Sequence, residues 1–163
     1  MTVQRLHISI PRQRLIFYEG DKWLFESLIS TAENGVGEKN GSGCTPRGKH
    51  IIRAKIGAGL SKNSVLVGRR PTGERYDKTL AATFPDRDWI LTRILWLSGC
   101  ELSHNRLGNV DTMRRYIYIH GSPDTVAMGK LGSHGCIRMR NDDIITLFDR
   151  VNLGASVMIS ETE

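Results

Sequence analysis

The sequence lacks the features of a membrane-spanning, fibrous or low-complexity protein. Its most apolar stretch, residues 89–97, is interrupted by Arg93, whereas a membrane helix needs about 18 consecutive apolar residues. Only 5 of the 163 residues are proline, and basic residues never form a run of five or more. With 39% hydrophobic and 25% charged residues, the composition is typical of a globular protein that does not span a membrane.

Signals that divide a chain into domains are also missing. No repeat and no long linker-like segment occurs, so we expect residues 1–163 to form a single domain. The opening residues contain neither an apolar segment of about 7–15 residues nor a small-residue cleavage site, so no secretion signal is predicted. The expectation is therefore that the protein stays inside the cell or that a leader is absent from this sequence.

Lysine and arginine outnumber the acidic residues by 23 to 17, a net charge of +6. This balance favours an anionic partner such as nucleic acid, anionic lipid or an acidic wall polymer, although a solvated surface of mixed sign explains it equally well. No helix-turn-helix, zinc-finger or aromatic RNA-binding pattern accompanies the charge. A nucleic-acid partner is therefore not predicted.

Cysteine is scarce: the chain has Cys44, Cys100 and Cys136. An odd number cannot be fully paired within one chain, so at least one thiol is free or intermolecular. A domain of this length buries enough surface to fold without a covalent staple. We expect that Cys44 and Cys100 do not form a disulfide that the fold requires.

The apolar pattern predicts a mainly β protein with one C-terminal helix. Strands are expected as a meander near residues 6–10, 15–18 and 23–25, and then at 50–56, 89–97, 115–120 and 155–159. A helix of about ten residues is expected near 141–151, with Asn141 as its N-cap and acidic residues in its first turn. Glycine-rich loops at residues 33–48 and 121–135 interrupt the strands.

Cys136 has the surroundings of a reactive thiol. Gly135 can adopt a tight turn that leaves backbone N–H groups free to form an oxyanion hole. A nearby imidazole would lower the thiol pKa well below about 8.5 and take its proton. Sequence distance alone does not rank His120 against His134, but a strand ending at His120 would hold its imidazole in place. We therefore assign His120 to proton transfer and His134 to shaping the site.

A zinc site is the competing interpretation of the same residues. His120, His134 and Cys136, with Cys100 or His104, contain enough ligands for zinc. However, the chain has no Cys-x-x-Cys pair, and His134 and Cys136 are closer than the usual ligand interval. The pattern favours a thiol enzyme without metal or organic cofactor.

Residues 133–139 read Ser-His-Gly-Cys-Ile-Arg-Met, with His-Gly-Ser at 120–122 and Asn-Asp at 141–142. This pattern resembles the signature of the L,D-transpeptidase catalytic domain, often called the YkuD domain. The resemblance extends to Thr-Pro-Arg-Gly at 45–48 and to residues 93–97, so it covers nearly the whole chain. Ser122 stands where threonine is common and keeps the hydroxyl.

The resemblance implies a β-sandwich-like fold of mixed sheets and a cysteine acyl-enzyme. The family nucleophile falls on Cys136 and the general base on His120. Ser133, His134 and Gly135 match the positions that shape the site and its oxyanion hole. By the same match, Gly121, Ser122 and Arg138 are expected to contact substrate, with Arg138 either holding the loop or meeting a carboxylate.

The implied substrate is a peptidoglycan stem peptide. In family members the thiolate attacks the carbonyl of the third stem residue, typically diaminopimelate, and expels the terminal D-alanine. The acyl group then passes to the amine of a second stem peptide or of a protein lysine. Water as the acceptor would instead make an L,D-carboxypeptidase or endopeptidase, and the sequence leaves that choice open.

Two further expectations come with the resemblance. Related enzymes are acylated by carbapenems, so covalent inhibition by a carbapenem is expected. Family members that act on the wall are usually exported, which predicts a location in the periplasm or cell wall. Because no leader is found, a cytoplasmic location and unconventional export are the alternatives.

Overall fold

The computed structural model describes residues 2–162, which contain ten strands and two α-helices. The strands are β1 (Gln4–Ser9), β2 (Arg14–Glu19), β3 (Lys22–Ser30), β4 (Gly48–Ile56), β5 (Ser64–Val67), β6 (Arg70–Arg75), β7 (Ile90–Gly99), β8 (Tyr118–Ser122), β9 (Ile137–Arg140) and β10 (Ser156–Ser160). The helices are α1 (Lys78–Thr83), α2 (Asn141–Arg150) and a 3₁₀ turn, η1 (Gly108–Val110). The predicted mainly β class and the C-terminal helix are confirmed.

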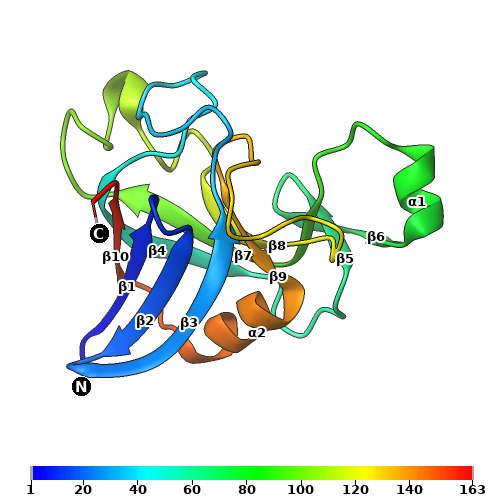
Figure 1. The fold of residues 1–163 in the computed structure, drawn as a ribbon, viewed down its shortest axis with the longest axis horizontal. Helices are drawn as coiled ribbons and strands as arrows, with labels where there is room; N and C mark the ends of the chain where they lie inside the picture. Colours follow the sequence, from blue (N-terminus) through cyan, green and yellow to red (C-terminus); the bar gives the residue numbers. More distant parts are fainter. Residues whose placement is uncertain (1, 163) are drawn as a thin grey trace.

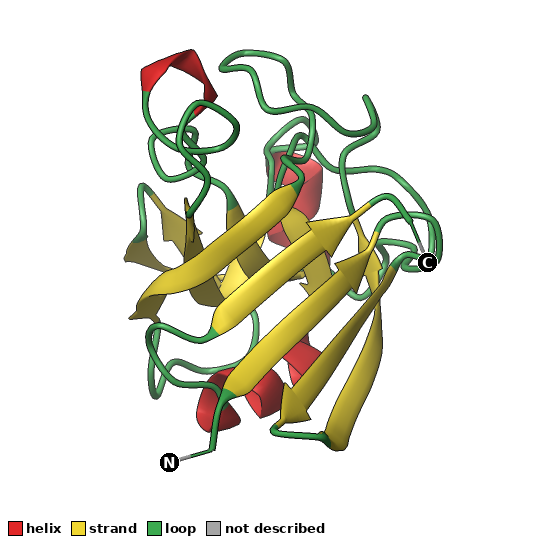
Figure 2. Cartoon of the chain, turned by 90° about the vertical axis from the view of Figure 1, so that its left-hand side faces the viewer, coloured by secondary structure: helices red, strands yellow, loops and turns green. Residues whose placement is uncertain are grey.

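All ten strands belong to one mixed sheet, in the order β4-β10-β1-β2-β3-β9-β8-β7-β5-β6. β1 pairs parallel with β10 and β8 parallel with β9, while the other pairs are antiparallel. β4 also pairs with β7, so the sheet curls and closes on itself, with β5 and β6 outside the ring. The β-sandwich-like fold that the resemblance implied is thus formed by one continuous hydrogen-bonded sheet (Figure 2).

The core lies between the inner face of this sheet and α2. Ile144, Leu147 and Phe148 of α2 are buried and contribute to one cluster with strand residues such as Ile119 and Ile137. Each such side chain contributes about 1.5–3 kcal/mol when it leaves water. Figure 1 shows α2 beside β9 and β7, where it supports the strands that carry the site.

The predicted N-cap of α2 is wrong. The helix begins at Asn141 itself, and the capping position is Arg140, which makes no side-chain cap bond. Asn141 is instead fully buried, where its amide accepts a hydrogen bond from Thr92 Oγ1 at 2.7 Å and donates to Asn63 Oδ1 at 2.8 Å. A tertiary hydrogen-bond network has replaced the local cap.

The strand expected at residues 115–120 starts later and runs further. Residues 111–117 form a turn in which the buried Asp111 carboxylate accepts from the backbone N–H groups of Leu107 and Arg114. Tyr116 has a φ of +58°, outside the extended region of regular strand residues. β8 therefore begins at Tyr118, and His120 lies in its middle rather than at its end.

Helix α1 was not predicted. Asp77 caps it by accepting a hydrogen bond from Leu80 N at 2.8 Å, but none of its residues is buried. It projects at the end of the molecule away from β1–β3 (Figure 1). Neither α-helix within residues 2–162 has the length and hydropathy that a membrane span requires.

Candidate active site

A cavity of about 430 Å³ contains both predicted catalytic residues, Cys136 and His120. Ser133, His134 and Arg138 line it as well, so tertiary folding brings together residues from β8, β9 and the loop between them. The other lining residues are Gly68, Arg69, Asp88, Ile90, Arg115, Tyr116, Ile117 and Tyr118. The volume lies within the range of small-molecule sites, about 300–1,000 Å³.

Cys136 lies in the turn at residues 133–136, directly before β9. Gly135 has a φ of +136°, and a Cβ atom there would stand 3.2 Å from Ile117 Cδ1. Only glycine accepts this conformation without strain. Thr45 Oγ1 fixes the turn from the neighbouring loop by donating to the Gly135 carbonyl at 2.9 Å.

Ser133 braces the same turn. Its hydroxyl donates to the Cys136 carbonyl at 2.6 Å and accepts from Gly135 N–H at 3.2 Å. The Gly135 N–H is therefore not one of the free donors expected around Cys136, because the Ser133 hydroxyl already satisfies it. Thr45 contributes to the turn as a residue whose role the sequence analysis did not recognise.

Backbone groups hold the thiol. Tyr118 N–H donates to Cys136 Sγ at 3.3 Å, and the thiol donates to the Tyr116 carbonyl at 3.4 Å. Burial raises the pKa of Cys136 to about 12, although the Tyr118 N–H favours the thiolate. The prediction of a low thiol pKa is thus wrong for the resting site, in which the thiol is uncharged.

His120 is 1% exposed in the middle of β8. Its Nδ1 lies 2.6 Å from the Gly121 carbonyl, and a carbonyl only accepts, so the ring proton sits on Nδ1 and Nε2 is free to take another. Burial lowers the pKa of His120, outweighing the Gly121 carbonyl and the Asp88 charge that raise it. The resting site therefore pairs a neutral imidazole with a neutral thiol, with no direct hydrogen bond between them in residues 2–162.

Asp88 connects two polar side chains of the cavity, those of Arg138 and His134. Its carboxylate lies 3.1 Å from Arg138 Nη2 and 3.5 Å from His134 Nδ1. Burial would raise the pKa of Asp88, but its electrostatic interactions with His120, Arg138 and His134 and the hydrogen bond from Arg138 bring the pKa below its usual value. Asp88 lies in the polar segment before β7, far from the Cys136 motif, so the sequence carries no local signal for its place in the site.

Arg138 holds the loop, which was one of its two predicted roles. Its Nη1 donates to the Gly132 carbonyl at 2.9 Å, in addition to the Asp88 contact. His134 is exposed, with 73% of its side chain accessible, and also lines a smaller cavity of about 220 Å³ beside the first. Both placements fit residues that shape the site rather than transfer the proton.

Gly121 and Ser122 do not line the cavity. Ser122 is buried, and its hydroxyl donates to the Met139 carbonyl at 3.1 Å, so β8 and β9 are joined by a side chain as well as by the ladder. A Cβ at Gly121 would collide with Asn141 Oδ1 and with the Leu91 carbonyl. Their placement does not support the predicted substrate contact; both hold the backbone that carries His120.

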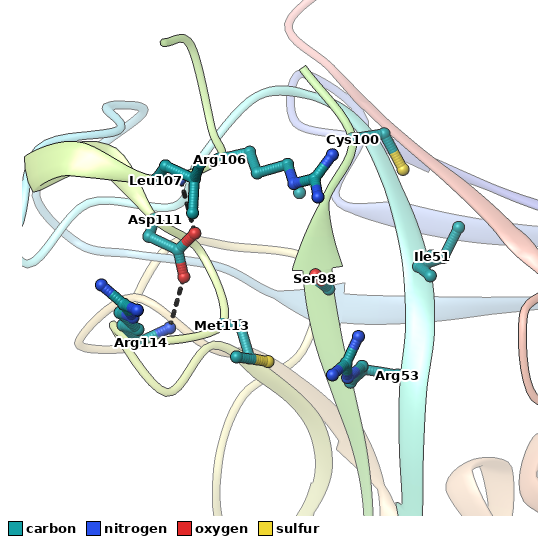
Figure 3. Close-up of a pocket in the computed structure, with 10 residues that line it drawn as sticks. Ile51, Arg53, Ser98, Cys100, Arg106, Leu107, Asp111, Met113 and Arg114 are labelled. Atoms are coloured by element: carbon teal, nitrogen blue, oxygen red, sulfur yellow. Dashed lines mark hydrogen bonds between the residues drawn. The ribbon is translucent and has the colours of Figure 1, made fainter. Parts of the chain in front are cut away.

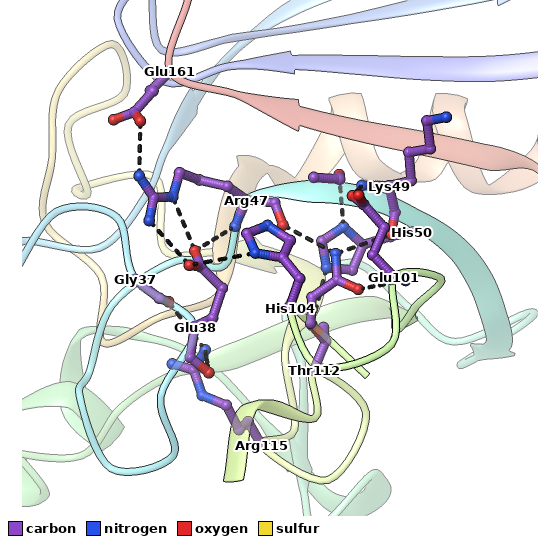
Figure 4. A network of polar contacts seen from close by, with 12 residues as sticks. Gly37, Glu38, Arg47, Lys49, His50, Glu101, His104, Thr112, Arg115 and Glu161 are labelled. Atoms are coloured by element: carbon purple, nitrogen blue, oxygen red, sulfur yellow. Dashed lines mark hydrogen bonds and ion pairs between the residues drawn. The ribbon is translucent and has the colours of Figure 1, made fainter. Parts of the chain in front are cut away.

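A clamp of arginine hydrogen bonds fixes the long glycine-rich loop at residues 33–48, which contacts the Cys136 turn through Thr45. Arg115 donates to the carbonyls of Gly37, Glu38 and Cys44 and to Ser42 Oγ, at distances between 2.6 and 3.3 Å. On the outer side of the loop, Arg47 pairs with Glu38 at 3.0 Å (Figure 4). The loop is therefore tied from both sides, although its composition alone would predict mobility.

A second cavity of about 380 Å³ contains Cys100 but no histidine. Arg53, Arg106 and Arg114 line it, together with Asp111, whose carboxylate serves the turn backbone (Figure 3). Cys100 therefore does not join Cys136 in a metal site, and residues 2–162 contain no group of three His, Cys, Asp or Glu side chains placed to hold a metal. Cys44, Cys100 and Cys136 are all free thiols.

Solved structures share this fold. L,D-Transpeptidase 3 from Mycobacterium tuberculosis, in complex with a faropenem-derived adduct, matches with a TM-score of 0.61 at 15% identity, over 98% of this chain and 61% of that one. An L,D-transpeptidase from Mycobacterium smegmatis matches with a TM-score of 0.58 at 16% identity, over 98% and 59%. The chain thus spans about three-fifths of the length of these two solved chains.

Sequence comparisons agree with the structural ones. The protein named "Probable L,D-transpeptidase ErfK/SrfK" from Escherichia coli (strain K12) is 49% identical over 45 residues, which are 28% of this chain and 14% of that protein. The sequence model of the L,D-transpeptidase catalytic domain (YkuD) matches residues 3–159. The chain therefore belongs to the L,D-transpeptidase catalytic domain (YkuD) family.

Proposed function

We propose that this protein is a cysteine-dependent L,D-transpeptidase that acts on peptidoglycan stem peptides. The observation that carries the proposal is the placement of Cys136 and His120 in one cavity, with the Nε2 atom of His120 left free by the Nδ1 contact to Gly121. Family membership supplies the substrate class, and residues 3–159 would act as one catalytic unit.

Acylation begins from the neutral pair. As Cys136 Sγ attacks the carbonyl of the third stem residue, its proton leaves the Tyr116 carbonyl and passes to Nε2 of His120. The S–C bond forms, the C–N bond to the terminal D-amino acid breaks, and the imidazolium returns the proton to the departing amine. The product is a thioester on Cys136.

The thioester is resolved by an amine. The neutral Nε2 of His120 takes a proton from the attacking amine, the new amide bond forms, and the thiol is restored by the proton that His120 releases. Because the Gly135 N–H is bonded to Ser133, the Cys136 N–H is our candidate donor to the oxyanion. Ser133, Gly135 and Thr45 keep this donor in place.

Proton transfer from a neutral thiol has an energetic reason here. A thiolate at Cys136 and an imidazolium at His120 would each carry a desolvation cost in this buried site. Burial therefore raises the pKa of Cys136 and lowers that of His120. The imidazolium and the negative charge form only as the sulfur–carbon bond develops. No metal or organic cofactor takes part in these steps.

Hydrolysis is the alternative outcome of the same acyl-enzyme. If water replaces the amine, the protein is an L,D-carboxypeptidase or endopeptidase with the same Cys136 and His120 chemistry. The reaction is decided by incubating the protein with purified disaccharide tetrapeptides and separating the products by mass spectrometry. Cross-linked dimers support transpeptidation; trimmed monomers alone assign hydrolysis; no product in the presence of intact Cys136 contradicts both.

Covalent inhibition tests the nucleophile without a wall substrate. The Mycobacterium tuberculosis structure is of a complex with a faropenem-derived adduct, and we propose that a penem or carbapenem acylates Cys136 here. Intact-protein mass after treatment with imipenem would then increase by one inhibitor equivalent. We further propose, from the family alone, that the protein works in the periplasm or at the cell wall.

A further inference from the structure

Arg69 is the arginine of the Cys136 cavity that makes the fewest hydrogen bonds to protein groups. Arg115 is taken up by the loop clamp, and Arg138 by Gly132 and Asp88. Arg69 makes one hydrogen bond, from Nη1 to the Tyr118 hydroxyl at 3.0 Å, and forms no ion pair within residues 2–162. A guanidinium has five N–H donors, so most of them remain for a ligand.

Two aromatic rings hold this guanidinium in place. Its central carbon lies 4.7 Å from the centroid of the Trp96 ring and 4.8 Å from that of Tyr116. Tyr118, which receives the hydrogen bond, also donates its backbone N–H to Cys136 Sγ. The charge is therefore preorganised next to the residue that holds the nucleophile, and little side-chain entropy remains to be lost on binding.

The backbone at Arg69 is costly for its residue type. Gly68 and Arg69 form the turn between β5 and β6 with φ values of +56° and +65°. Such turns favour glycine and asparagine, and a residue with a larger side chain at positive φ is uncommon. An arginine kept in this conformation, with its side chain in the cavity, indicates a role for the guanidinium.

We propose that Arg69 forms a carboxylate-binding subsite that selects stem peptides with a free carboxylate close to the attacked carbonyl. The inference rests on the proposed function and specifies its substrate. Two carboxylates qualify: the side-chain carboxylate of the third residue, where that residue is diaminopimelate, and the carboxylate of the terminal D-alanine. Arg69 binds either as a planar fork, which lysine does not reproduce.

The test compares three tetrapeptides on wild type and Arg69→Gln. One peptide has both carboxylates free, one has the third-residue carboxylate amidated, and one ends in D-alaninamide. Wild type should prefer the free peptide over one amidated peptide by at least about tenfold in kcat/KM, and Arg69→Gln should reduce that preference below about twofold. The amidation that loses its effect in the variant identifies the carboxylate that Arg69 binds.

Matched variants separate charge from geometry. Arg70, the exposed neighbour on the same hairpin, does not line the cavity, so Arg70→Gln should keep the wild-type preference. Arg69→Lys should retain only part of it. Melting temperatures of all variants check that the hairpin is intact.

The proposal is overturned if wild type shows no preference, or if Arg69→Gln loses the same factor on free and amidated peptides. If wild type turns over none of the peptides, the proposed function fails. Calorimetric titration then tests separately whether Arg69 forms a carboxylate-binding subsite. In that titration the free peptide must bind wild type more tightly than its amides, and this difference must disappear in Arg69→Gln. Equal binding of acid and amide by wild type also overturns the subsite.

Discussion

Two cavities of similar volume, about 430 and 380 Å³, each contain one cysteine and three arginines, and the turn at residues 111–117 lines both. Around Cys136 the arginines are fixed: Arg115 by four acceptors, Arg138 by Gly132 and Asp88, and Arg69 by Tyr118 and two rings. Around Cys100 the guanidiniums of Arg53, Arg106 and Arg114 make no hydrogen bond or ion pair within residues 2–162.

The cavities also differ in proton acceptors. His120 and His134 line the Cys136 cavity, whereas the Cys100 cavity has no histidine and only Asp111, whose carboxylate accepts hydrogen bonds from the turn backbone. Cys100 is exposed, and burial still raises its thiol pKa, with Arg106 opposing. Similar residue types thus give a candidate active site only where neighbouring side chains are fixed and a base is at hand.

Replacement of each cysteine by alanine should give the largest difference between the two cavities. Cys136→Ala should abolish both turnover and the imipenem adduct, because it removes the one thiol within residues 2–162 that shares a cavity with His120. Cys100→Ala should leave both within about twofold of wild type, as expected for a surface substitution away from the site. Intact-protein mass and product analysis measure the two effects. An adduct that persists in Cys136→Ala would move the nucleophile elsewhere.

Substitution of the two histidines should have the next largest effect on kcat/KM. His120→Gln should lower kcat/KM by at least about a hundredfold, because it removes the proton acceptor. His134→Gln, which alters an exposed side chain, should cost less than about tenfold. Steady-state kinetics on the disaccharide tetrapeptide, with circular dichroism to confirm folding, compares the two. The opposite ranking would assign proton transfer to His134.

Alkylation of the thiols should show the burial of Cys136. Because its folded-state pKa is raised to about 12, the rate of iodoacetamide reaction at Cys136 should keep increasing about tenfold per pH unit above 8.5, where an ordinary thiol levels off. Peptide mass spectrometry of the Cys44→Ala variant measures the alkylation of Cys136 and of Cys100 separately. A plateau below pH 8 at Cys136 would restore the thiolate–imidazolium pair that the sequence suggested.

The same shift links pH to stability. Above about pH 8.5 the unfolded chain ionises Cys136 while the folded chain does not, so this group's contribution to the free energy of unfolding decreases as pH rises. Cys136→Ala should remove that part of the decrease. Denaturant unfolding between pH 8 and 10.5 measures it, and an unchanged slope in the variant would contradict the raised pKa.

Asp88→Asn should produce a smaller change, about threefold to tenfold in kcat/KM. The carboxylate raises the pKa of His120, so its removal should lower that pKa and move the acid limb of the kcat/KM profile to lower pH. A merely structural role would reduce the rate without moving this limb. The pH dependence of kcat/KM therefore distinguishes the two.

Substitution of an arginine in each cavity should give the smallest difference, which is one of protein stability. Arg138→Gln loses bonds to Gly132 and Asp88 and should lower stability by about 1–2 kcal/mol. Arg53→Gln breaks no such contact and should stay within about 0.5 kcal/mol of wild type. Urea unfolding measures both. Equal losses would show that the cavities do not differ in the way their arginines are held.

Sequence reasoning succeeded where the information was local. The meander at β1–β3, the strand at β7 and the amphipathic face of α2 follow from the spacing of apolar residues, and the structure confirms them. It failed where side-chain hydrogen bonds decided the conformation or the burial of a residue. The alternation at residues 115–117 suggested a strand, but Asp111 binds the backbone into a turn; Asn141 looked like a cap, but Thr92 and Asn63 bind its side chain in the interior.

By itself, the sequence determined the mainly β class, the C-terminal helix and the grouping of Cys136, His120 and His134, because periodicity and a compact motif are properties of neighbouring residues. The tertiary structure alone brought Asp88 and Arg69 into the cavity and Thr45 against the Gly135 carbonyl, from segments 48 to 91 positions before Cys136. It also decided the charge state of the site. Burial is a property of the assembled sheet and loops, and it is burial that keeps both the Cys136 thiol and the His120 imidazole neutral at rest.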